Sequence, residues 1–170
     1  MSEIKADTQA IRRTVEGQAG WMRDALRRLV EVESPSDSKA AVDACGAVAA
    51  RIAEGIGGRV KRHRQREFGD VLEIRWGATG GRGILLLGHL DTVWPLGTLA
   101  KMPWKEKDGR FFGPGVLDMK AGVAMALAAM RVLGDAGVRR PVARIRLPDI
   151  LTPFPPKSCT HVPRCPLSVT

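Results

Sequence analysis

A short apolar run, Gly83 to Gly88, constrains the fold of this 170-residue chain more than any other stretch. It is bounded by glycines and carries no charge, a pattern typical of a strand buried on both faces. It leads directly into His89-Leu90-Asp91. In α/β sheets, ligands usually bind at the carboxyl ends of the strands. We therefore expect a functional site at His89.

The spacing of His89 and Asp91 predicts that the two side chains act together. Residues two apart on an extended chain point to the same side. An imidazole that binds a metal ion through one nitrogen is usually held by a carboxylate on the other, which fixes its tautomer. A strand-end histidine bonded to an aspartate without any metal gives the same pattern, so the pair alone leaves both interpretations open.

A second candidate is Asp118, which follows the glycine- and proline-containing loop 113–115 and precedes a helix predicted over 119–133. Near a helix N-terminus the helix dipole keeps a carboxylate ionised. Such a carboxylate can bridge two divalent ions, and it can equally be a simple N-cap. Between the two motifs, Trp94 either packs beneath the site or flanks a substrate, and packing is the default interpretation.

Together the two motifs are more specific than either alone. The segments HLDTVWPLGTL and GPGVLDMKAG, in this order and spacing, resemble the zinc-dependent aminoacylase and carboxypeptidase family, most closely its glutamate carboxypeptidase branch. The resemblance covers about residues 20 to 142. It implies that His89 is a zinc ligand, that Asp91 is the catalytic-site residue orienting it, and that Asp118 bridges two zinc ions. It also implies a metallopeptidase that releases a C-terminal amino acid such as glutamate from a peptide or small-molecule substrate with a free carboxylate.

The remaining patterns predict an α/β fold. The resemblance implies a three-layer catalytic domain with a mostly parallel central sheet and flanking helices. The smaller domain that pairs subunits in many relatives has no counterpart in the sequence. Helical and strand periodicities and turn residues predict helices over 8–33, 39–55 and 119–133, strands over 60–67 and 71–76, and a hairpin over 104–112 with an Asp108-Gly109 turn.

The pattern changes near residue 142, where the next parallel strand is expected. Residues 142–148 read VARIRLP, and two arginines and a proline do not suit a central strand. We therefore interpret residues 1–142 as the N-terminal part of a zinc-peptidase-like catalytic domain. The Pro-rich residues 143–170 are expected to be an unrelated, disordered or extended tail. A shift of reading frame near residues 140–143 is our hypothesis for this change.

The change also removes expected chemistry. The resemblance implies a Glu-Glu pair that supplies the general base and a further ligand, yet no glutamate follows Glu106. We therefore expect weak or partial zinc binding by His89 and Asp118, and negligible turnover. A Cys-x-His-x3-Cys cluster in the tail lacks a fourth ligand and does not predict a zinc site; its members are Cys159, His161 and Cys165.

The net charge of +9 raises an alternative, a non-catalytic basic protein that binds nucleic acid or another acidic partner. The densest basic run, 59–66, lacks interleaved aromatic residues and is more typical of a solvated strand edge, with His63 exposed and unliganded. Cys45 is expected to be a small buried hydrophobe. The acid-containing start and the absence of a long apolar run lead us to expect a cytoplasmic protein without a membrane segment.

Overall fold

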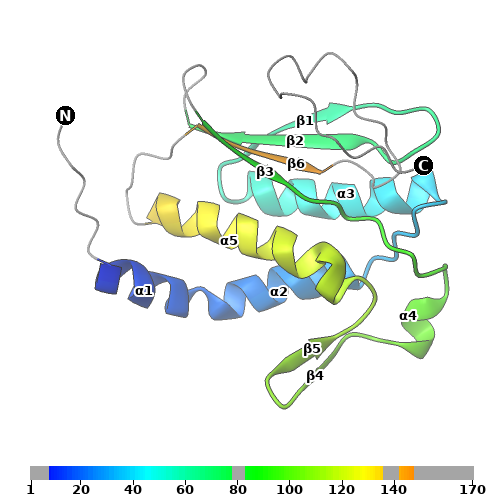
Figure 1. The fold of residues 1–170 in the computed structure, drawn as a ribbon, viewed down its shortest axis with the longest axis horizontal. Helices are drawn as coiled ribbons and strands as arrows, with labels where there is room; N and C mark the ends of the chain where they lie inside the picture. Colours follow the sequence, from blue (N-terminus) through cyan, green and yellow to red (C-terminus); the bar gives the residue numbers. More distant parts are fainter. Residues whose placement is uncertain (1–7, 78–82, 136–141, 148–170) are drawn as a thin grey trace, which may run out of the picture.

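In the computed structural model, which describes residues 8–77, 83–135 and 142–147, a four-stranded sheet lies against a layer of helices (Figure 1). The strands lie side by side in the order β1 (Arg59–His63), β2 (Val71–Trp76), β6 (Val142–Leu147) and β3 (Gly83–Leu87). Figure 1 shows α3 and α5 beneath the sheet and α1 and α2 beyond them. The helices and smaller elements are α1 (Thr8–Gly17), α2 (Ala19–Val30), α3 (Lys39–Glu54), α4 (Thr98–Lys101), the hairpin β4 (Lys105–Lys107) and β5 (Arg110–Phe112), the irregular turn η1 (Val116–Lys120), and α5 (Ala121–Asp135).

The sheet is mixed, and the expectation of a mostly parallel sheet is wrong for the described strands. β1 pairs with β2 and β2 with β6 in antiparallel fashion, and only β3 and β6 run parallel. The short connection between the consecutive strands β1 and β2 permits their antiparallel pairing, whereas the parallel pair β3 and β6 is joined through the crossover helix α5. Among the described residues the helices cover one face of the sheet, so two of the three expected layers are seen.

The core lies between this sheet and the helices. Its most buried members come from α2, α5, β2 and β6 and include Leu29, Leu127, Ile74 and Ile145, each at most 1% exposed. Burying one such side chain contributes roughly 1.5–3 kcal/mol, so the core accounts for the mutual position of these elements. Cys45 belongs to the same core at 0% exposure, which confirms the expectation of a buried hydrophobe.

Most of the predicted elements are confirmed, with one helix divided. The helix predicted over 8–33 is two helices that end at Val30 and meet at Gln18, whose backbone N–H donates to the carbonyl of Val15 at 3.0 Å. Gly17 and Gly20 flank this point, and glycine disfavours a continuous helix. The predicted hairpin is also present, and positive φ angles of 51° at Asp108 and 69° at Gly109 form its turn.

Strand β6 corrects the expectation that two arginines exclude residues 142–147 from the middle of a sheet. The strand lies between β2 and β3, with Ile145 1% and Leu147 3% exposed against the helices. Arg146 alternates to the other face, where it stands in register with Glu73 and Leu87. Because the described helices cover only one face, period-two alternation is sufficient for this position. Residues 148–170 of the expected tail lie outside the described residues, and so do Cys159, His161 and Cys165.

Strand β3 corrects a second expectation, that this apolar run is buried on both faces. It is the last strand of the described sheet, and its side chains Leu85 and Leu87 are 56% and 52% exposed. An uncharged run therefore predicted the strand correctly but not its surroundings. A strand's burial depends on neighbours that are distant in the sequence.

The basic run lies at the opposite edge. Arg59, Lys61 and Arg62 of β1 are exposed at the end of the sheet, as a solvated strand edge predicts. His63, expected to be exposed, is instead partly buried, and its Nε2 lies 2.9 Å from Glu73 Oε2 on the neighbouring strand. Within the three described ranges, every helix is too short or too polar to span a bilayer.

Candidate metal centre

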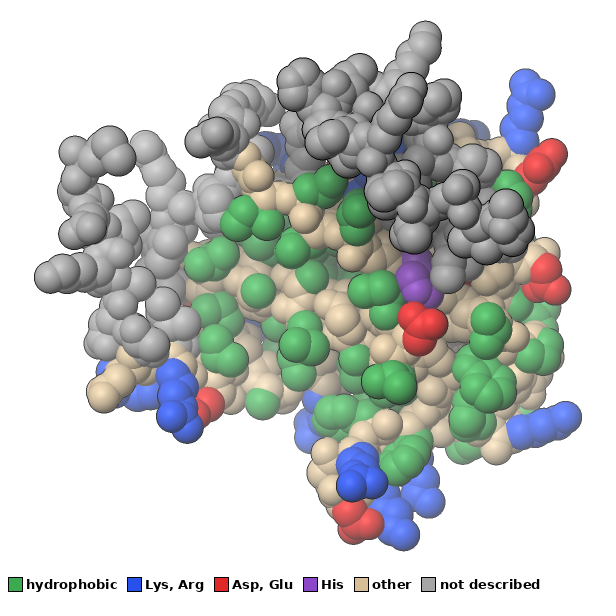
Figure 2. All heavy atoms as spheres, in the orientation of Figure 1, with side chains coloured by type: hydrophobic (Ala, Val, Ile, Leu, Met, Phe, Trp, Pro, Cys, Tyr) green, Lys and Arg blue, Asp and Glu red, His purple; other side chains and the backbone are tan. Residues whose placement is uncertain are grey.

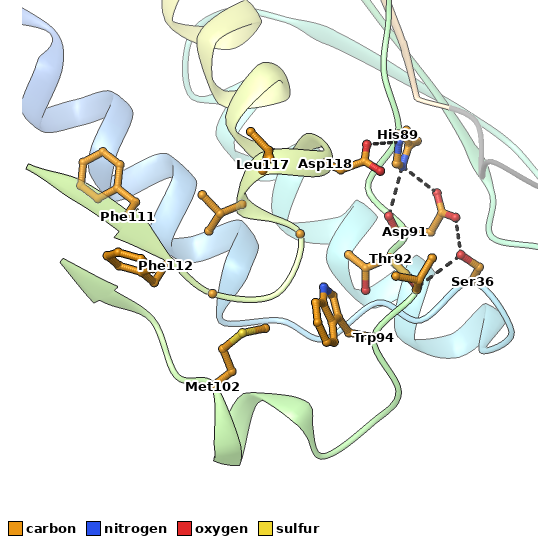
Figure 3. A pocket seen from close by; sticks show the side chains of 14 residues that line it. Ser36, His89, Asp91, Thr92, Trp94, Met102, Phe111, Phe112, Leu117 and Asp118 are labelled. Carbon is orange, nitrogen blue, oxygen red and sulfur yellow. Dashed lines mark hydrogen bonds and ion pairs between the residues drawn. The ribbon is translucent and has the colours of Figure 1, made fainter. Parts of the chain in front are cut away.

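A cavity of about 380 Å³ opens where β3 ends, between the loop that follows it, the end of β5 and the turn η1 (Figure 3). Backbone pairing continues to this point, since the N–H of Gly88 donates to the carbonyl of Arg146 at 3.1 Å. Two aspartates and a histidine line the polar end of the cavity, and aromatic and aliphatic side chains line the rest. The polar residues are His89, Asp91, Asp118, Ser36 and Thr92.

His89 lies between two carboxylates. Its Nδ1 is 3.3 Å from Oδ1 of Asp91 and 3.1 Å from the carbonyl oxygen of the same residue. Its Nε2 is 3.1 Å from Oδ1 of Asp118, as the dashed lines in Figure 3 show. The two side chains that the sequence predicted as metal ligands, 29 positions apart, therefore meet at one point.

Asp91 is the buried member of this group, with a side chain that is 0% exposed. Its hydrogen bond to His89 raises the imidazole pKa to about 9, even though burial of the ring acts in the opposite direction. Oδ2 of Asp91 accepts a hydrogen bond from the Ser36 hydroxyl at 2.5 Å. The carboxylate is thus placed behind the imidazole, where the sequence predicted an orienting residue.

Asp118 lies in η1, just before α5, and not in a regular first helical turn. Its φ of −123° and ψ of 99° are extended, and its side chain is 80% exposed and directed toward His89. An extended residue can cap a helix, but the contact that the structure shows for the Asp118 carboxylate is with Nε2 of His89. Gly115 has a φ of 72°, and a Cβ atom there would lie 2.5 Å from Cγ2 of Thr92, so the turn needs glycine to pack against the loop after β3.

Lys120 lies beneath this turn, and no sequence pattern predicted a functional role for it. Its side chain is 0% exposed and its Nζ donates to the carbonyls of Leu29 and Val32, both at 2.9 Å. Leu29 lies in the last turn of α2, whose carbonyls lack intrahelical partners, and Val32 lies just beyond the end of the helix. Burial lowers the pKa of Lys120. The turn that carries Asp118 is therefore bonded to α2.

The apolar part of the cavity includes Trp94, which is 43% exposed, together with Phe112, Leu117 and Met102. The default expectation that Trp94 packs beneath the site is therefore wrong, because its ring lies along the cavity (Figure 3). On the face shown in Figure 2, hydrophobic side chains dominate the middle, and most charged side chains lie toward the margins. The wall beside the two carboxylates is thus suited to an apolar group.

Sequence comparison assigns this arrangement to a family. The profile of peptidase family M20/M25/M40 matches residues 85–148, which include His89, Asp91 and Asp118. The chain belongs to this family, and it carries part of the catalytic domain. The match extends over residues 143–148, which the sequence pattern had placed in the tail.

Relatives and solved structures agree with this assignment. Carboxypeptidase G2 from Pseudomonas sp. (strain RS-16) is 31% identical over 116 residues, which are 67% of this chain and 28% of that protein. Human carnosine dipeptidase 1 superposes with a TM-score of 0.70 at 20% identity, over 84% of this chain and 34% of that chain. Aminopeptidase PepT from Bacillus cereus gives a TM-score of 0.61 at 23% identity, over 74% of this chain and 35% of that chain. The chain therefore spans about a third or less of these relatives' lengths.

The M20 family is metal-dependent, and the donor atoms of the site fit a metal ion in part. Zinc bonds to nitrogen and oxygen of about 2.0–2.2 Å at a tetrahedral angle place two donor atoms roughly 3.4 Å apart. Nε2 of His89 and Oδ1 of Asp118 are 3.1 Å apart, close to that separation. Within the part of the chain that the structure describes, no group of three or more His, Cys, Asp or Glu side chains is placed to hold a metal. The described site thus offers two ligands.

Proposed function

We propose that the chain is the first part of a zinc-dependent hydrolase domain. The whole protein would cleave an amide or peptide bond and release a C-terminal amino acid such as glutamate. The observation that carries the proposal is the meeting of His89 Nε2 with Asp118 Oδ1 at the cavity, with Asp91 behind the imidazole. A histidine held by a carboxylate and facing a second, accessible carboxylate is the arrangement that a hydrolytic metal site needs.

In this proposal His89 and Asp118 hold zinc, and Asp91 is the positioning residue for His89. A bound zinc ion would polarise the scissile carbonyl and lower the pKa of a water molecule. Asp91 would keep Nδ1 of His89 protonated, so that Nε2 presents its lone pair to the cavity. The wall formed by Trp94 and Phe112 would accept an apolar part of the substrate and exclude water from the site.

The chain as it stands lacks the group that would take a proton from the attacking water. No glutamate follows Glu106, and the acidic residues beyond Asp118 are Asp135 and Asp149. Asp135 is at the end of α5, 17 positions after Asp118 in the sequence, and it pairs with Arg131 at 3.5 Å. We therefore propose weak zinc binding and negligible hydrolysis by this chain.

Zinc titration of the purified chain tests the proposed site. His89→Ala and Asp118→Ala should each remove most of the binding measured by competition with a chromophoric chelator, because each leaves a single ligand. His63→Ala is the matched control, since His63 also pairs with a carboxylate but lies on the sheet edge. Binding that survives in both site variants, or that is lost equally in His63→Ala, would place the metal elsewhere.

A hydrolysis assay tests the second half of the proposal. Purified chain supplied with zinc and an acyl-glutamate substrate should show no turnover above that of free zinc, because the general base is missing. Turnover that is abolished by His89→Ala would contradict this statement and would require a base that lies outside the described residues.

A further inference from the structure

We propose that Ser36 is a positioning residue of the metal centre, acting on His89 through Asp91. This inference rests on the metal site of the proposed function. In the sequence Ser36 only follows the proline that ends the helical pattern, and it is the structure that brings it to the cavity (Figure 3).

The two oxygens of the Asp91 carboxylate have different partners. Oδ1 lies 3.3 Å from Nδ1 of His89, and Oδ2 accepts the Ser36 hydroxyl at 2.5 Å. A carboxylate that is bonded at both oxygens cannot rotate about its own axis without losing one of the two bonds. Since the Asp91 side chain is 0% exposed, bulk water does not readily replace a lost donor. Ser36 therefore sets the plane in which Oδ1 meets the imidazole.

Ser36 is itself held by the backbone of the site loop. Its N–H donates to the carbonyl of Thr92 at 3.0 Å, and the N–H of Thr92 donates to the carbonyl of Ser34 at 2.7 Å. These bonds form a short parallel bridge between Pro35 and Thr92. The hydroxyl of Ser36 lies 3.3 Å from the Thr92 carbonyl and closer, 2.5 Å, to Asp91. The backbone bridge thus positions the Ser36 hydroxyl next to the Asp91 carboxylate.

Ser34 provides a matched control two positions away. Its hydroxyl donates to the carbonyl of Leu90 at 2.7 Å, and the residue is 1% exposed. Ser34→Ala and Ser36→Ala each remove one hydroxyl from the same turn, but only Ser36 donates its hydroxyl to Oδ2 of Asp91. A merely structural role for Ser36 would make the two variants equivalent.

The first test is zinc affinity of the chain by chelator competition. Ser36→Ala should weaken binding about tenfold, the lower end of the range for groups that orient a metal ligand. Ser36→Thr, which keeps the hydroxyl, should restore affinity to within about twofold, and Ser34→Ala should also stay within about twofold. In an Asp91→Ala background, Ser36→Ala should have no further effect. An unchanged affinity in Ser36→Ala, or an equal loss in the Asp91→Ala background, would overturn the inference.

A second readout separates this inference from the proposed function. In the metal-free chain, ¹⁵N–¹H spectra of the His89 side chain report the Nδ1 proton that faces Asp91. We expect this signal to shift or broaden in Ser36→Ala and to be preserved in Ser34→Ala and Ser36→Thr. If the wild-type chain binds no zinc, the proposed function fails, and the spectra still decide the role of Ser36. An identical His89 signal in wild type and Ser36→Ala would overturn the inference whatever the metal result.

Discussion

Two histidine–carboxylate pairs occur in the described part of the molecule, and they are built differently. His89 lies at the end of β3 between Asp91 and Asp118, on the wall of a cavity. His63 lies on the edge strand β1 against Glu73, which also forms an ion pair with Arg75. Each imidazole has a nitrogen within about 3.3 Å of a carboxylate oxygen, so distance alone does not distinguish them.

The difference between the pairs is the balance of charge. Glu73 is neutralised mainly by Arg75, whose hydrogen bond lowers the pKa of Glu73 to about 2. At His89 two carboxylates meet one imidazole. The buried Lys120 donates hydrogen bonds to the backbone carbonyls of Leu29 and Val32, and its charge also acts on Asp91. Two carboxylates that meet at one imidazole can hold a metal ion in place of its protons, whereas a carboxylate already paired with arginine is less available to a cation. A His-x-Asp or His–Glu contact predicts a metal only when the surrounding cations are known.

The largest effect on stability is expected at Lys120. Lys120→Met should lower the free energy of unfolding by about 3 kcal/mol, because it leaves the buried carbonyl of Leu29 and the partly buried carbonyl of Val32 without this donor. Urea unfolding measures the change. Lys105→Met on the exposed strand β4 is the control and should stay within about 0.5 kcal/mol of wild type. If Lys120→Met and Lys105→Met changed the free energy of unfolding equally, the buried Lys120 would not support the turn next to His89 and Asp118.

A smaller, pH-dependent effect is expected at Glu73. Its pKa falls from 4.5 to about 2 in the folded chain, so it adds stability above pH 4.5 that is lost as the pH drops toward 2. Glu73→Gln should cost about 2 kcal/mol at pH 7, less than the full shift implies, because Arg75 is 37% exposed. The gap between wild type and variant should close between pH 4.5 and pH 2 in urea titrations. Glu54→Gln, at the exposed end of α3, is the control and should stay within about 0.5 kcal/mol of wild type at pH 7. A stability difference at Glu73 that does not change with pH would contradict the charge pairing assigned to Glu73.

The smallest effect on stability is expected at Asp118, although its effect on zinc is large. Asp118→Asn should change the free energy of unfolding by less than about 0.5 kcal/mol, because the side chain is 80% exposed. Zinc affinity should fall at least tenfold, since a neutral amide replaces a charged ligand. Thermal unfolding and chelator competition on the same sample measure both. If Asp118→Asn lost much stability but still bound zinc, Asp118 would be a structural residue. It would then not differ from Glu73, which stabilises the fold.

Sequence patterns predicted those parts of the fold that depend on near neighbours. The periodicity of residues 39–54, the alternation of residues 71–76 and the Asp108-Gly109 turn each lie within one element, and each is confirmed. The same patterns failed where an element's environment mattered. They predicted that β3 is buried on both faces and that β6 is not a central strand. Both predictions are wrong, because burial depends on strands and helices that the local sequence does not contain.

The candidate site divides in the same way. His89, Asp91 and Asp118 by themselves left both a metal site and a simpler role open, and the resemblance of the two motifs to the family implied a ligand pair with an orienting carboxylate. Only the tertiary structure showed that Ser36 and Lys120 hold the site, the first at Asp91 and the second beneath the turn of Asp118. A sequence motif contains the residues whose side chains take part in the chemistry of a site. Which distant hydroxyl or ammonium group reaches them is decided by the packing of α2 against the loops after β3 and before α5, which no local pattern encodes.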